Sequence, residues 1–169
     1  MKLDVGCGLK PSGDINIDTL VDWNTSIDFD LKNIPNFIIA DGMHLPFRYK
    51  IFNLVICDMA FEHFLDPLKA LKNFTYVSDN LYIVVTNVAI IEDYKNHYYS
   101  WSRESFYNLL DVFYNDINIR IFTKNIMSIE HILIKIIKKI PLFGRLLIRI
   151  ISRYIGYNIQ AICKHPRIC

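Results

Sequence analysis

The feature that most constrains the fold is a glycine turn that follows an apolar run at the start of the chain. Residues 2–5 (Lys-Leu-Asp-Val) have a strand-forming pattern, and Gly6, Cys7 and Gly8 come next. Two glycines one residue apart predict a tight turn in which a ligand can lie against the main chain. In open parallel sheets such turns lie at the carboxyl ends of strands, where ligands bind. We therefore expect an α/β fold with a ligand site at this turn.

Apolar or alternating runs predict further strands along the chain. They lie at residues 15–18, 37–41, 52–58, 81–87, 118–122 and 157–163. The run at 37–40 is continuously apolar and ends at Asp41-Gly42, which predicts a buried parallel strand. One helix is predicted from Asp66-Pro67 to Val77, and another begins near Trp101 with Ser102 as its cap. Apolar positions at helical spacing are expected in the core of the first helix: Leu68, Leu71, Phe74 and Tyr76 or Val77.

Composition is compatible with one compact domain over residues 1–169. The chain is 52% hydrophobic, and its net charge of +2 gives no reason to expect a nucleic-acid partner. The four cysteines lack zinc-type spacing, which predicts buried thiols in a reduced cytoplasm and no metal site. They are Cys7, Cys57, Cys163 and Cys169. The first residues lack the apolar core of a signal peptide, which also predicts a cytoplasmic protein.

Two motifs carry a family resemblance. Asp4, Gly6 and Gly8 fill the acidic-x-Gly-x-Gly pattern, and Asp58 is followed after three residues by Glu-His-Phe at 62–64. Together these blocks resemble class I S-adenosylmethionine-dependent methyltransferases of the type 11 group. The third glycine of nicotinamide and flavin sites is absent, because Pro11 and Ser12 stand in its place. The resemblance implies a Rossmann-like, three-layer α/β/α fold with a seven-stranded, mostly parallel sheet whose last strand is antiparallel.

The resemblance also implies S-adenosylmethionine as cofactor and assigns residues to it. Asp18 would bind the ribose hydroxyls, Asp41 would meet the exocyclic amine of adenine, and Met43 would line the adenine pocket. Plain strand ends and a core methionine are the alternatives. The full implied cofactor set is Asp4, Gly6, Cys7, Gly8, Asp18, Asp41, Gly42, Met43, Asp58 and Met59.

A base near neutral pKa is needed for an oxygen acceptor, and His63 and His97 are the candidates. For His63 the alternative is a hydrogen bond that holds its loop. Only ten positions separate Gly8 from Asp18, so the usual crossover helix is expected to be a turn or absent. We expect residues 87–100, or the basic helices that follow later, to cover the cofactor instead.

Residues 124–156 predict a basic amphipathic helical insertion between the last two strands. Its lysines and arginines recur at helical spacing beside wide apolar faces. Residues 126–155 therefore predict peripheral membrane contact or a homodimer, with a solvated helical insertion as the alternative. We expect a methyltransferase that acts on a small-molecule, sugar or lipid-linked acceptor. The alternative is a non-catalytic methyltransferase-like module that binds a partner or a membrane surface.

Overall fold

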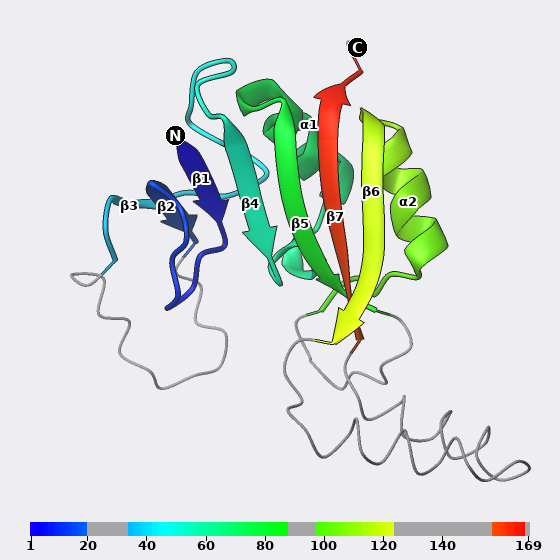
Figure 1. Ribbon diagram of the computed structural model, residues 1–169. Helices are drawn as coiled ribbons and strands as arrows, with labels where there is room; N and C mark the ends of the chain where they lie inside the picture. Colours follow the sequence, from blue (N-terminus) through cyan, green and yellow to red (C-terminus); the bar gives the residue numbers. More distant parts are fainter. Residues whose placement is uncertain (20–33, 88–96, 124–156, 168–169) are drawn as a thin grey trace, which may run out of the picture.

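The computed structural model describes residues 1–19, 34–87, 97–123 and 157–167 (Figure 1). Their core is one seven-stranded sheet in the order β3-β2-β1-β4-β5-β7-β6. The strands are β1 (Lys2–Val5), β2 (Ile15–Asp18), β3 (Phe37–Ile39), β4 (Leu54–Asp58), β5 (Asn80–Thr86), β6 (Tyr114–Thr123) and β7 (Tyr157–Pro166). β1 to β5 pair in parallel, and β7 runs antiparallel to both β5 and β6. The expected mostly parallel sheet with an antiparallel last strand is confirmed.

The sheet register explains which side chains form the core. Leu3 pairs with Val55, Val55 pairs with Leu81, and Leu81 pairs with Cys163. All four side chains are fully buried, because residues in register across a sheet point to the same face. This face therefore carries an apolar row across the four central strands.

Two α-helices cover that face. Helix α1 (Pro67–Val77) begins at Asp66, whose side chain accepts a hydrogen bond from the Lys69 amide, and α2 (Arg103–Asp111) begins with a capping box of Ser102 and Ser105. The rings of Phe74 in α1 and Phe106 in α2 both contact Phe61, which lies in the short 3-10 helix η2 (Phe61–His63). Both helices lie behind the sheet in the view of Figure 1. Any helices on the other face fall outside the described residues.

Several expected features are confirmed in detail. The caps of both helices are Asp66 and Ser102, as their sequence patterns predict. Residues 6–14 connect β1 to β2 by turns without a helix, in agreement with the short spacing.

Other expectations are wrong. β3 was expected to be buried, but it is the edge strand, and Ile39 is 63% exposed. Leu68 was expected in the core but is 51% exposed, whereas Leu71, Phe74 and Val77 are fully buried as predicted. β6 begins at Tyr114 rather than residue 118, directly after α2. The start of helix α2 at Arg103 agrees with the predicted cap Ser102, and Trp101 forms an isolated bridge with Asn87.

The predicted basic insertion at 124–156 lies outside the described residues, as do residues 88–96 of the segment that is expected to cover the cofactor. Residues 20–33 also lie outside the described residues. Within the described ranges, the structure contains no helix that is long and apolar enough to cross a membrane.

Candidate functional site

The predicted cofactor residues gather where the parallel strands end. The glycine turn follows β1, Asp18 ends β2, Asp41 comes two residues after β3, and Asp58 ends β4. Figure 1 shows the arrowheads of β1, β4 and β5 at the same edge of the sheet. This edge is where open parallel sheets bind ligands.

The glycine turn is tied to the end of β2. The amides of Gly6 and Cys7 both donate to the carbonyl of Ile17, at 2.9 and 3.1 Å. Gly6 has φ +71°, and a Cβ there would lie 2.3 Å from the Cβ of Ala60, so packing excludes a side chain. Gly8 has φ +51°, and a Cβ there would meet nothing within 4 Å. The turn thus closes against Ala60 on one side and leaves open space beside Gly8.

Asp18 is joined directly to this turn. Its Oδ2 accepts a hydrogen bond from the Gly8 amide at 3.0 Å, and its Oδ1 accepts one from the Thr19 amide at 2.7 Å. A carboxylate oxygen has two acceptor positions, so each oxygen keeps capacity for a further donor. Both oxygens of Asp18 are therefore oriented and can still accept from a pair of hydroxyl groups.

Asp4 is buried beneath the loop that follows the turn. Its Oδ2 accepts from the Ser12 amide at 2.8 Å and from the Ser12 hydroxyl at 2.9 Å. Burial raises the pKa of Asp4 above its usual 3.8, the two Ser12 hydrogen bonds oppose that rise, and the charges of Asp58 and Asp18 add to it. The three carboxyl groups thus form an acidic cluster, which favours a cationic ligand.

The cysteine of the turn is a neutral thiol. Burial, followed by the charges of Asp18 and Asp4, raises the pKa of Cys7 to about 12. Cys57 and Cys163 are also buried and free, as expected, while Cys169 lies outside the described residues. Within the part of the chain that the structure describes, no three His, Cys, Asp or Glu side chains form a metal-type group.

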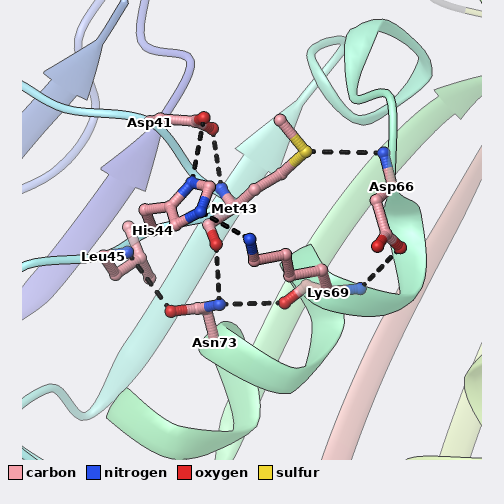
Figure 2. A network of polar contacts seen from close by, with 7 residues as sticks. All are labelled: Asp41, Met43, His44, Leu45, Asp66, Lys69 and Asn73. Carbon is pink, nitrogen blue, oxygen red and sulfur yellow. Dashed lines mark hydrogen bonds and ion pairs between the residues drawn. The ribbon is translucent and has the colours of Figure 1, made fainter.

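The Asp41 loop is fastened to α1 by a network of polar contacts (Figure 2). Asp41 Oδ1 accepts from the Met43 amide at 2.8 Å, and Oδ2 lies 3.3 Å from His44 Nδ1. Asn73 in α1 donates to the Met43 carbonyl at 3.0 Å and accepts from the Leu45 amide at 3.2 Å. These contacts hold the loop backbone on both sides of His44.

Gly42 and Met43 have different surroundings. A Cβ on Gly42 would lie 2.7 Å from the ring of Phe64 and 2.8 Å from Val5, so the loop passes close to β1 and to the end of η2. The sulfur of Met43 lies 3.4 Å from the Asp66 amide and points toward the start of α1 (Figure 2). A role of Met43 in lining an adenine pocket stays a prediction.

Met59 has an unusual backbone at the end of β4. It has φ 60°, and its amide donates to the Val84 carbonyl of β5 at 2.9 Å. A non-glycine residue in this region carries backbone strain, which is concentrated at functional sites. The turn at Met59 places the next residue, Ala60, against Gly6.

The two histidines predicted as candidate bases are brought together. The rings of His63 and His97 meet edge to face, with centroids 4.4 Å apart and planes at 79°. The carbonyl of Glu62 accepts from the amides of Tyr98 at 3.0 Å and Tyr99 at 3.4 Å. Because residues 62 and 98 are joined by backbone, their neighbours 63 and 97 are brought together.

Glu62 is a buried acid beneath this pair. Its side chain is fully buried, and its Oε1 accepts a hydrogen bond from Thr86 Oγ1 at 2.7 Å, whereas its Oε2 has no hydrogen-bond partner among the described residues. The carboxyl group therefore ties η2 to the end of β5 from inside the core.

Sequence reasoning missed the supporting residues of the site. The side chains that hold the predicted acids or their loops are those of Ser12, His44, Asn73 and Thr86. Glu62 was considered only as part of the Glu-His-Phe motif. His44 carried a usable signal, because it stands three residues after Asp41 in a tight loop. Asn73 and Thr86 carried none, since their partners are 24 or more residues away in sequence.

Two surface hollows in the described structure lie away from this site. Both border α2 and β6, and between them they involve Tyr107, Ile117 and Ile119. β6 is at the end of the sheet opposite to β3, and none of the predicted cofactor residues lines either hollow.

Comparisons with known proteins agree with this geometry. Residues 3–78 match the family model described as "Methyltransferase domain". No curated protein sequence matches significantly. A candidate methyltransferase from Bacillus halodurans is similar in structure, with TM-score 0.61 and 16% identity over 98% of this chain and 92% of that one.

Two further structures are similar. The plantazolicin methyltransferase BpumL, solved with S-adenosylhomocysteine, has TM-score 0.54 and 21% identity over 97% of this chain and 75% of its own. A Haemonchus contortus phosphoethanolamine N-methyltransferase, solved with phosphomonomethylethanolamine and S-adenosylhomocysteine, has TM-score 0.65 and 13% identity over 98% and 48%. The chain therefore has the fold of class I S-adenosylmethionine-dependent methyltransferases, and its residues 3–78 match a methyltransferase domain.

Proposed function

We propose that the protein is an S-adenosylmethionine-dependent methyltransferase that acts on a small-molecule acceptor. The observation that carries the proposal is the hydrogen bond from the Gly8 amide to Asp18, which joins an open glycine turn to an oriented carboxylate. Crystallised relatives of the same fold bind S-adenosylhomocysteine, which supports the choice of cofactor.

The residues at the strand ends suit the parts of this cofactor. Asp18 would accept hydrogen bonds from the two ribose hydroxyls, and Asp41 would accept one from the adenine amine. The open space at Gly8 would receive the part of the cofactor that lies against the main chain. S-adenosylmethionine is a cation that supplies an activated methyl group on sulfur, and the acidic cluster of Asp4, Asp18 and Asp58 favours a positive charge at this place.

His63 and His97 are proposed as the groups that accept the proton of the acceptor. The amide of His63 donates to the carbonyl of Ala60 at 3.1 Å, and Ala60 packs on the glycine turn. Imidazole has the right chemistry for a general base near neutral pH, and such a base contributes roughly 10²–10⁴-fold to a rate. Holding the acceptor in line with the reactive bond is the other contribution that the protein would make.

A sugar or lipid-linked acceptor remains the finer proposal, and it rests on the basic segment 126–155. Membrane contact or dimerisation through that segment is proposed on its sequence pattern alone. The competing function is a module that keeps the fold and binds a partner without catalysis. A cofactor titration combined with a search for a methylated product separates the two functions.

The first experiment is calorimetric titration with S-adenosylmethionine and S-adenosylhomocysteine. Asp18→Ala and Asp41→Ala are each expected to weaken binding about tenfold or more, because hydrogen bonds to a charged group contribute about 1.5–3 kcal/mol. Asp116→Asn is the matched control, since Asp116 is an exposed acid on β6. A folded wild-type protein that binds neither ligand would refute the proposal.

The second experiment searches for the acceptor. The protein is incubated with isotope-labelled S-adenosylmethionine and separate lipid and water-soluble fractions of a cell extract. Label that appears in one fraction, and that is lost with Asp18→Ala, identifies the class of acceptor. Cofactor binding without label in either fraction would favour the non-catalytic module.

A further inference from the structure

We infer that His44 is a positioning residue. It fixes the Asp41 carboxylate through a relay of side-chain contacts that runs from Asp41 through His44 to Lys69. The fixed carboxylate makes the site selective for a purine with an exocyclic amine. This inference deepens the proposed function and rests on it. No residue of the relay beyond Asp41 belongs to the predicted cofactor set.

The relay crosses from the loop after β3 to helix α1 (Figure 2). His44 Nδ1 lies 3.3 Å from Asp41 Oδ2, and the ammonium group of Lys69 contacts His44 Nε2. Lys69 is itself held near the start of α1, where its amide donates to Asp66 Oδ1 at 3.0 Å. The imidazole ring therefore bridges an acid and a base that are 28 residues apart in sequence.

The two contacts determine which nitrogen of the His44 ring carries the proton. An ammonium group has only donors, so His44 Nε2 must accept from Lys69. The proton of the neutral imidazole then resides on Nδ1 and is donated to Asp41 Oδ2. The side chain of Asp66 accepts a hydrogen bond from the Lys69 amide at 3.0 Å.

The result is a carboxylate that is held at both oxygens. Met43 donates to Oδ1 at 2.8 Å and His44 donates to Oδ2. Each oxygen keeps one acceptor position, so the carboxylate presents acceptors in a set direction. The carboxyl side chain is 34% exposed, which leaves it accessible to a ligand.

An oriented acceptor distinguishes two kinds of purine. The amine of adenine donates a hydrogen bond to the carboxylate, whereas the oxygen of a 6-oxopurine faces it with a lone pair. A site built to pair with one polar group discriminates strongly against an analogue that leaves it unpaired. Without His44 the carboxylate would turn toward solvent, and the discrimination would decrease.

The test compares the dissociation constants of S-adenosylhomocysteine and S-inosylhomocysteine, in which an oxo group replaces that amine and N1 carries a proton. In the wild-type protein the inosine compound is expected to bind more weakly. His44→Phe should reduce the ratio of the two constants about tenfold, which corresponds to one hydrogen bond to a charged group. His44→Asn retains a donor toward Asp41 and should retain most of the ratio.

Two further variants complete the test. Lys69→Met leaves His44 in place and is expected to reduce the ratio by a smaller factor than His44→Phe. His165→Asn is the matched control, because it removes another exposed His–Asp contact, on β7, and should leave the ratio unchanged. The side chain of His44 is 62% exposed, so His44→Phe is expected to fold.

The outcomes separate this inference from the proposed function. The inference is overturned if His44→Phe weakens the binding of both ligands by the same factor. It is also overturned if neither His44→Phe nor Lys69→Met changes the ratio of the two dissociation constants. Both outcomes leave the cofactor assignment intact. A wild-type protein that binds neither ligand removes the proposed function, and the inference with it.

Discussion

The imidazole rings of His63 and His97 lie edge to face, with their centroids 4.4 Å apart. They are 34 residues apart in sequence and were each selected as a base candidate for a separate reason. Their contact depends on the hydrogen bonds from Tyr98 and Tyr99 to the Glu62 carbonyl. The two candidates are therefore one paired group at the strand ends.

Replacing either histidine of the pair is expected to slow methyl transfer more than it weakens cofactor binding. His63→Gln or His97→Gln should lower the rate roughly 10²–10⁴-fold if the pair supplies the base. The measurement is label transfer to the identified acceptor, alongside calorimetric titration with S-adenosylhomocysteine. A fall in affinity with an unchanged rate at saturation would assign the pair to binding, and His165→Asn controls for general effects of losing an imidazole.

The two glycines of the turn are expected to differ when replaced by alanine. In Gly6→Ala, the left-handed backbone should lower the free energy of unfolding by about 1–2 kcal/mol. The new Cβ would also lie 2.3 Å from the Cβ of Ala60. Overpacking adds about 1–3 kcal/mol. Gly8→Ala has only the backbone cost, because no atom lies within 4 Å of its Cβ. Urea denaturation measures both changes.

Gly8→Ala should instead weaken S-adenosylhomocysteine binding, since the new methyl group occupies open space beside the turn. If Gly8→Ala binds as tightly as the wild type, that space does not receive the cofactor.

Removing the charge of Asp4 is expected to stabilise the protein increasingly as the pH rises. Burial raises the pKa of Asp4, so its favourable contribution to stability is complete below 3.8 and is lost as the pH rises through the raised value. Because Asn cannot titrate, the melting temperature of Asp4→Asn relative to the wild type should increase between pH 3.5, which is below the usual pKa of 3.8, and pH 7.

Asp116→Asn, at an exposed acid, is the control for this comparison. A difference in melting temperature that stays constant with pH would show that folding does not raise the pKa of this carboxyl. Asp4→Asn should also weaken binding of S-adenosylmethionine, because the acidic cluster loses one negative charge.

Removing the partner of the buried acid is expected to destabilise the fold. Thr86→Val takes away the 2.7 Å hydrogen bond to Glu62 Oε1 while Oε2 already has no hydrogen-bond partner in the described part of the chain. Leaving a buried polar group without its hydrogen-bond partner costs about 1–3 kcal/mol, whereas Glu62→Gln keeps the acceptor for Thr86 and should cost less. Urea denaturation compares them with Thr75→Val, whose hydroxyl bonds to a carbonyl within α1. Equal costs for Thr86→Val and Thr75→Val would contradict this account.

The sequence by itself determined the local elements of this protein. The caps Asp66 and Ser102, the turn at Gly6 and Gly8, and the apolar strands were readable because each depends on residues within a few positions of one another. The family resemblance added the antiparallel last strand and the acids at the strand ends. These signals were sufficient for the fold and for the candidate cofactor residues.

Only the tertiary structure decided which elements and side chains meet. Its sheet order places β3 at an edge, so an apolar run that reads as buried is largely exposed. It also brings His63 against His97 and His44 against Lys69. The physical reason is that these contacts link residues 25 or more positions apart, and local propensity carries no information about partners at such distances.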